Sequence, residues 1–305
     1  MIYEKNKKYY FFWMFHIGIA KSTLSQIYKK LSFDDMVNIY NGHFLDYAIS
    51  KIRFLKKDVN ILSDNVLLAN SKHEVSKIFT DFTKFGVKVV FFYDDLYPVS
   101  LKEIPNPPFV LFARGNYAQL DKIKLISVAG SRQISTHSAI KLRHIITELV
   151  QKNYGIVSGL ALGTDIIANE TAYKDRGYSV AVLPSSIFSI LPKTNVASAE
   201  KLLKNGGLLI SEYYDNNFSK SRYIQRNRII SGLGSAVLLP EFKARSGTIH
   251  TARFAWLQSK KIFCFNNDSS GVQKVLASGN AFIFNSTEDL IKMHYLAKVP
   301  FPYLS

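Results

Sequence analysis

The chain has 305 residues, of which 47% are hydrophobic and 20% charged, a balance that excludes a disordered protein and is typical of a globular one. The formal net charge is +16, and residues 121–305 carry most of it, with 23 Lys and Arg against 12 Asp and Glu. This excess favours a polyanionic partner, although a lysine-rich composition without functional meaning is an alternative. The single cysteine, Cys264, excludes an internal disulfide, and the sequence predicts a soluble, cytoplasmic protein.

Residues 1–80 are predicted to form a small helical domain that is SAM-like or helix-hairpin-helix-like. The apolar spacing of residues 23–31 fits a helix, and Ser32 is a candidate N-cap for the next one. Residues 17–20 lie between two helical stretches and could form a turn whose amides hold a DNA phosphate, with a plain helical turn as the alternative. The apolar run at residues 9–15 is too short and too aromatic for a signal peptide.

Residues 81–296 are predicted to form a Rossmann-like domain. From Leu125 onward, strands alternate with helices, which indicates an α/β fold with an extended, doubly wound, mostly parallel sheet. Strands are expected at residues 87–92, 109–115, 125–129, 155–158, 179–183, 208–211, 236–239, 261–265 and 281–284. Helices are expected at about residues 136–152, 165–176, 195–205, 222–232, 247–258 and 286–296. A short C-terminal tail, residues 297–305, is expected to follow.

Glycine-containing turns follow three of these strands, at the edge where a parallel sheet presents backbone N–H groups to phosphate. The first turn combines a glycine for close approach, a hydroxyl donor and an arginine that can grip phosphate with two hydrogen bonds. In the second turn, Asp165 either orients donors or caps the next helix. The residues predicted to bind phosphate are Gly130, Ser131, Arg132, Ser158, Gly159, Gly163, Arg245, Ser246, Gly247 and Thr248.

Further basic residues lie between the second and third turns. Lys193 belongs to a proline-bounded loop at residues 184–195, where it is either solvated or close enough to the sheet edge to contact phosphate. A basic run follows at residues 220–228, with aromatic side chains at Tyr213, Tyr214, Phe218 and Tyr223 nearby. Aromatic rings among arginines suit bases stacked beside a gripped backbone, whereas a solvated helix face is the alternative. The predicted binding residues here are Lys193, Arg222, Arg226, Asn227 and Arg228.

Cofactor and catalytic motifs are missing from the sequence. The dinucleotide fingerprint G-x-G-x-x-G, the P-loop and the G-x-S-x-G elbow are not found, and the histidines lack metal-ligand spacing. Glu241 and His250 flank the third turn, but each has a simple structural explanation. We therefore expect no cofactor, no metal site and no catalytic residues.

The order of these motifs resembles the DNA-processing protein A family (DprA, also called Smf), over residues 80–293. The matching segments are Tyr97-Pro98, Ile104-Pro105-Asn106-Pro107-Pro108, Gly130-Ser131-Arg132, Ser158-Gly159-Leu160-Ala161, Ser211-Glu212-Tyr213, Arg226-Asn227-Arg228-Ile229-Ile230-Ser231-Gly232 and Arg245-Ser246-Gly247-Thr248. The resemblance implies a non-enzymatic protein that binds and protects single-stranded DNA and loads the RecA recombinase in natural transformation. It also implies a homodimer, and it points to Arg132, Lys193, Arg226 and Arg228 as DNA-binding residues.

The chain departs from the family pattern at several positions. Leu162 stands where members usually have a basic residue, and Asn169 where they usually have a histidine. Residues 184–186 and 266–267 replace glycine-containing stretches, and no winged helix is expected after the last helix. Two other functions stay open. One is a nucleotide-processing, phosphoribohydrolase-like enzyme that would use Glu241, and the other is an interaction module without DNA contacts.

Overall fold

The computed structural model describes residues 6–48, 50–217 and 219–295, so the predicted tail at 297–305 and Phe218 lie outside the described residues. The chain divides into two compact units, residues 1–89 and residues 90–305. No helix among the described residues is both long enough and apolar enough to cross a membrane.

Unit 1 is helical and has an aromatic core. Its helices are α1 (Lys7–His16), α2 (Lys21–Lys30), α3 (Phe33–Tyr40), α4 (Leu45–Ala48), α5 (Lys56–Leu62) and α6 (Asn65–Lys84). Trp13 of α1 is fully buried and donates a hydrogen bond to the Ser71 hydroxyl, 2.9 Å away. Ser32 caps α3 as predicted, in a reciprocal pair with Asp35. The aromatic run at the start of the chain is thus core packing.

The turn between α1 and α2 is closed by a carboxylate of the same unit. Asp58 is fully buried and accepts hydrogen bonds from the Ala20 amide at 2.9 Å and the Thr23 hydroxyl at 2.5 Å. These are the donors that a phosphate would need at the start of a helix. In unit 1 that anion position is therefore already filled.

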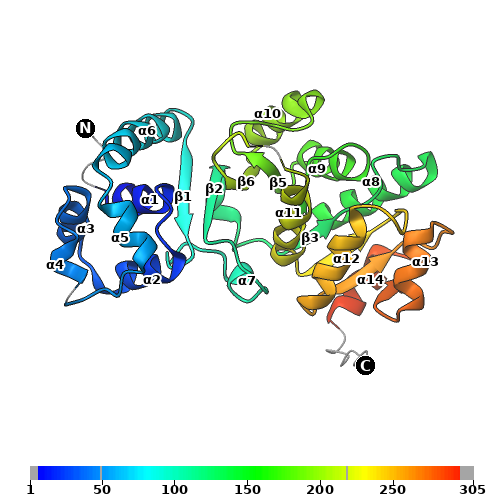
Figure 1. Cartoon of the computed structure of the whole chain (residues 1–305). Coiled ribbons are helices and arrows are strands. Elements are labelled where there is room, and N and C mark those ends of the chain that lie inside the picture. The colour runs from blue at the N-terminus through cyan, green and yellow to red at the C-terminus, as the bar shows by residue number, and fades with distance from the viewer. Residues whose placement is uncertain (1–5, 49, 218, 296–305) are drawn as a thin grey trace. The chain divides into compact units, whose positions relative to one another are not determined.

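The described residues form a nine-stranded sheet in the order β1-β2-β6-β5-β4-β3-β7-β8-β9. Figure 1 shows its strands among the helices of residues 90–305. The strands are β1 (Val87–Phe91), β2 (Val110–Gly115), β3 (Leu125–Val128), β4 (Gly155–Ser158), β5 (Ser179–Ser186), β6 (Leu208–Tyr213), β7 (Ala236–Leu239), β8 (Lys261–Cys264) and β9 (Ala281–Ile283). From β6 to β9 all neighbours are parallel, and β2 is antiparallel to β6. The predicted doubly wound α/β fold is confirmed.

Alternating residues of the central strands face two layers of helices. Ile126 and Val128 of β3 pack in one apolar cluster with α8 (Thr136–Gln151) and α9 (Thr164–Lys174). The neighbouring Leu125 belongs to a cluster with α11 (Lys220–Leu233), and Ala129 to one with α12 (Thr248–Leu257). The remaining helical elements of unit 2 are α7 (Val99–Lys102), η2 (Tyr117–Gln119), η3 (Lys193–Asn195), α10 (Val196–Lys204), α13 (Ser270–Ala277) and α14 (Thr287–Tyr295).

The structure differs from the predicted elements most clearly at the end of one strand and at one helix. Strand β5 continues through Pro184 to Ser186, where a proline-bounded loop was expected, and its register against β6 shifts between Leu183 and Ser186. Such an irregularity tolerates proline, which cannot donate to a regular ladder. Helix α13 was not predicted, because the sequence at residues 266–270 is polar and looks like a loop. Its buried Gly271 and Val272 pack the helix on the core.

Candidate functional site

A cleft of about 650 Å³ lies at the carboxyl ends of β3 and β7. These neighbouring strands lead their helices to opposite faces of the sheet, which is where ligands bind in open α/β folds. Its lining residues are Ala129, Gly130, Ser131, Arg132, Gln133, Ala161, Leu162, Asp165, Tyr223, Ile224, Arg226, Asn227, Lys243, Arg245, Ser246, Gly247, Thr248 and Thr251. Nine of the residues predicted to bind phosphate are among them, and all three glycine turns contribute to its walls.

The first turn, at Gly130-Ser131-Arg132, is held by backbone contacts on both sides. The Ser131 amide donates to the Glu241 carbonyl at 2.8 Å, and the Ser131 carbonyl accepts from the Thr164 amide at 3.0 Å. A β-carbon on Gly130 would lie 2.5 Å from the Thr164 hydroxyl, so only glycine fits. The exposed Arg132 side chain is thereby carried on a rigid turn at the rim of the cleft.

The second turn shapes the cleft mainly from behind. Ser158 is fully buried and donates to the Val128 carbonyl at 2.6 Å, so its hydroxyl ties β4 to β3. Gly163 has φ +72°, and a β-carbon there would collide with the backbone of Ser131 and Arg132. Ser158, Gly159 and Gly163 do not line the cleft, although all three were predicted to contact phosphate.

A buried carboxylate occupies the anion position of this second turn. The backbone amides of Gly159 and Ala161 donate to Asp165, which is 6% exposed. The Arg226 guanidinium approaches the same turn and donates to the carbonyls of Gly159 at 2.7 Å and Val182 at 2.5 Å. Burial raises the pKa of the Asp165 carboxyl and lowers that of the Arg226 guanidinium, while their mutual attraction opposes both shifts. Asp165 therefore orients the donors of the second turn, whereas α9 itself has no side-chain cap at Gly163.

The third turn leads into α12 and presents cations to the cleft. Lys243, Arg245 and Gly247 are exposed, and the Thr248 hydroxyl donates to the Gly130 carbonyl at 3.0 Å, which ties this turn to the first. Helix α12 has no capping side chain at Gly247. Two hydroxyl oxygens, those of Ser246 and Thr251, are buried and have no hydrogen-bond partner among the described residues.

Helix α11 supplies the remaining wall. The Arg132 guanidinium lies over the Tyr223 ring, 5.8 Å from its centroid, and the Asn227 amide donates to the Gly247 carbonyl at 3.3 Å. Of the lining residues in the described ranges, Arg132, Arg226, Lys243 and Arg245 are cationic and Asp165 is acidic. The cleft thus combines positive charge with an aromatic ring, an arrangement suited to a phosphate-bearing, base-containing ligand.

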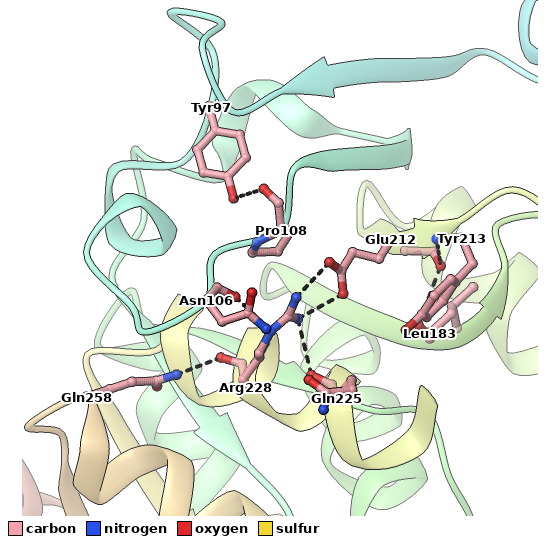
Figure 2. A network of polar contacts seen from close by, with 10 residues as sticks. Tyr97, Asn106, Pro108, Leu183, Glu212, Tyr213, Gln225, Arg228 and Gln258 are labelled. Carbon is pink, nitrogen blue, oxygen red and sulfur yellow. Dashed lines mark hydrogen bonds and ion pairs between the residues drawn. The ribbon is translucent and has the colours of Figure 1, made fainter. Parts of the chain in front are cut away.

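Arg228 lies on the same helix but takes part in a separate network, shown in Figure 2. Its guanidinium forms two hydrogen bonds with the Glu212 carboxylate, at 2.6 and 2.8 Å, and a third with the Asn106 carbonyl at 2.9 Å. Both side chains of the ion pair are largely buried. Arg228 does not line the cleft, so this predicted binding residue ties α11 to the proline-rich segment before β2.

Two other predicted residues also lie outside the cleft lining. Arg222 pairs with Asp215 at 2.9 Å and stacks on the Tyr213 ring at 4.0 Å. Lys193 is exposed in η3, whose Asn195 donates to the Leu160 carbonyl at 2.8 Å. This bond keeps η3 beside the second turn, so Lys193 stands at the same edge of the sheet as the cleft.

Sequence reasoning missed three cleft residues, Lys243, Gln133 and Thr251. Lys243 sits two residues before Arg245 in a segment already singled out, so its proximity to a predicted binding residue was an available signal. Thr251 is one of two threonines in α12, and the family resemblance extends to Thr251-Ala252, but Thr251 was not among the predicted binding residues.

Glu241 and Cys264 could take part in chemistry, but each has a structural role in its surroundings. The Glu241 carboxylate accepts from the Ser135 hydroxyl at 2.6 Å and does not line the cleft. Its burial opposes ionisation, but hydrogen bonds from Ser135 and Ser138 outweigh that and lower the pKa of Glu241. Cys264 is fully buried in β8, and burial raises the pKa of its thiol to about 12, so it packs in the core as an inert residue.

Comparison with known proteins agrees with this architecture. The sequence model of the family described as DNA recombination-mediator protein A matches residues 88–294. The DNA processing protein DprA of Bacillus subtilis is 28% identical over 244 residues, covering 76% of this chain and 82% of that protein.

Two solved structures are also similar. The X-ray structure of DprA from Streptococcus pneumoniae has a TM-score of 0.71 at 26% identity and covers 93% of this chain and 96% of its own. The structure of DNA processing protein A from Helicobacter pylori, studied for its single-stranded DNA binding mode, has a TM-score of 0.62 at 28% identity and covers 68% and 95%. The resemblance noted in the sequence is confirmed, and the chain belongs to the DNA recombination-mediator protein A family.

Proposed function

We propose that this protein binds single-stranded DNA through the cleft at the carboxyl ends of β3 and β7 and acts as a recombination mediator rather than an enzyme. The observation that carries the proposal is the convergence of Arg132, Lys243 and Arg245 on a cleft that also holds the Tyr223 ring. Cations grip phosphates without regard to sequence, and an aromatic ring stacks on an unpaired base. A duplex hides its base faces, so this combination favours single strands.

Family membership supports a proposal for the biological setting. A relative from Helicobacter pylori was studied for its single-stranded DNA binding mode, and others are named DNA processing proteins. We propose that this chain protects incoming DNA and loads RecA during natural transformation, as a homodimer in the cytoplasm. The geometry of Glu241, which caps the segment before α8 and does not line the cleft, gives no support to a phosphoribohydrolase-like activity.

Fluorescence anisotropy with labelled oligonucleotides tests the binding proposal. We expect single strands to bind more tightly than duplexes, and the logarithm of affinity to fall linearly with the logarithm of salt concentration. Arg132→Ala should weaken binding by about tenfold or more, because a hydrogen bond to a charged phosphate is lost. It should also reduce the salt slope by about 0.7.

Arg253→Ala is the matched control. Arg253 is exposed on α12 but does not line the cleft, so its loss removes the same charge from another face of that helix. Equal effects of the two variants, or equal affinity for single and double strands, would contradict the proposed site.

A further inference from the structure

We propose that the start of α12 is a site for the terminal phosphate of a DNA strand, a phosphate monoester at either the 5′ or the 3′ end. This inference rests on the single-stranded DNA binding proposed above and names the chemical group that this part of the cleft would hold. It stands on two observations: amides and buried hydroxyls at the start of α12 have no partner among the described residues, and cationic side chains line the same cleft.

At three other helix starts, a side chain of the protein itself accepts backbone hydrogen bonds. Asp58 fills the start of α2 in unit 1, and Asp165 fills the turn before α9. At the start of α8, the Ser135 hydroxyl accepts from the Ser138 amide at 3.2 Å. At each of these three positions, a side-chain oxygen of the protein accepts at least one hydrogen bond that a phosphate could otherwise accept.

The start of α12 differs from them in its unmet hydrogen-bonding capacity. Gly247 provides no capping side chain, and within the described ranges the amides of Gly247 and Thr248 donate to no acceptor. Thr251, in the first turns of the helix, is 1% exposed and lines the cleft, and its hydroxyl has no partner among the described residues. The Ser246 hydroxyl oxygen is also buried and has no partner among the described residues, and Ser246 lines the cleft as well. Buried polar atoms are rarely left unpaired unless something else completes them, and here a ligand in the cleft would do so.

The charge and shape of the site favour a monoester over an internal phosphodiester. A monoester carries between one and a half and two negative charges at about pH 7 and has three strong acceptor oxygens. Lys243 and Arg245 stand beside the helix start, and its dipole adds positive potential. Arg226 and Thr251, which also line the cleft, are both buried. A volume of about 650 Å³ suits a nucleotide-sized ligand.

The test compares three oligonucleotides of one sequence, with a 5′-phosphate, a 3′-phosphate or hydroxyl groups at both ends, by competition in fluorescence anisotropy. We expect one phosphorylated form to bind about tenfold more tightly than the unphosphorylated one, since it gains charge-assisted hydrogen bonds. The form that gains identifies the end that is recognised. Equal affinity of all three would overturn this inference and leave the DNA-binding function standing, whereas no binding by any of them would overturn both.

Variants of the unpartnered hydroxyls locate the effect. Thr251→Val and Ser246→Ala remove oxygen atoms that bond to nothing in the described part of the protein, so folding should be unaffected. Each should lower affinity for the favoured phosphorylated strand by about tenfold. Thr83→Val is the control, because the Thr83 hydroxyl bonds only to the Phe79 carbonyl of its own helix in unit 1. If Thr251→Val and Ser246→Ala match the control while the phosphate preference persists, the assignment to α12 is wrong.

Discussion

Arg226 and Arg228 stand two residues apart on α11 and are equally buried, each 4% exposed, yet they belong to different kinds of network. Arg228 meets a carboxylate that matches its planar fork, and its hydrogen bonds close on groups of the protein. Arg226 meets two carbonyls and has Asp165 nearby, and it borders a cleft whose other walls carry three more cations.

The difference shows that burial alone does not separate a structural arginine from one at a binding site. When a guanidinium is paired with a carboxylate through two hydrogen bonds, its charge is neutralised and its N–H donors are already used. At the cleft, four cations face one carboxylate, so net positive charge remains for a ligand. The useful question for a basic run is therefore which of its members already has an acid.

The largest effect on stability should come from removing Arg228 from its ion pair with Glu212. Arg228→Met removes one partner of a buried ion pair and leaves the Glu212 carboxylate buried without compensation. We expect the free energy of unfolding to fall by about 3–5 kcal/mol, measured by urea denaturation.

The double variant Arg228→Met with Glu212→Leu provides the control. Because it removes both charges, it should recover much of the lost stability. A loss below about 1 kcal/mol in the single variant would mean that the pair behaves like an exposed one.

A smaller loss of stability should follow from a substitution that crowds the Arg226 guanidinium. A β-carbon on Gly159 would lie 2.5 Å from the Asp165 carboxylate and closer still to the Arg226 guanidinium. Gly159→Ala should therefore lower the free energy of unfolding by about 1–3 kcal/mol and weaken DNA binding, because the arginine must shift.

Gly247→Ala is the matched substitution for stability. Nothing lies within 4 Å of a β-carbon there, so its unfolding midpoint should stay close to that of the native chain. Equal midpoints for Gly159→Ala and Gly247→Ala would show that the packing around Arg226 can relax without cost.

The smallest effect, a change in DNA affinity, should come from adding a positive charge to the lining of the cleft. Leu162 is 47% exposed and lines the cleft. Leu162→Lys should tighten single-stranded DNA binding by a few-fold and steepen the salt dependence, as expected for about one additional phosphate contact.

Leu257→Lys adds the same charge at a leucine that is 44% exposed but lies outside the cleft lining. Anisotropy titrations of both variants in the same salt series provide the comparison. A gain of equal size in both would indicate that net charge, rather than position at the cleft, controls affinity.

Much of the fold could be predicted because hydrophobic runs and glycine turns mark the strands of a parallel sheet directly. Strands β4 and β7 match the predicted residues at both ends. Helix α13 was missed because its core contacts are made by only a few side chains, including Val272 and Val275. The extension of β5 past Pro184 was missed because only the register shift against β6 makes room for proline there.

The candidate site was only partly predictable, for a different reason. Motif position located the cleft at the first and third turns, but the direction of each side chain depends on partners distant in sequence. Arg228 forms an ion pair with Glu212, and Arg222 forms one with Asp215. Asp165 accepts hydrogen bonds from the amides of the second turn. Such pairings across the fold cannot be read from local spacing.

The pairing of β3 with β7 joins Ile126 to Ala236, residues separated by more than a hundred positions along the chain. Contacts of this kind form slowly, because a long loop must close before they contribute stability. The cleft does not exist until that pairing is made, since one wall follows each strand. DNA binding should therefore recover late in refolding, after helical signal has returned, which makes it a reporter of completed assembly for unit 2.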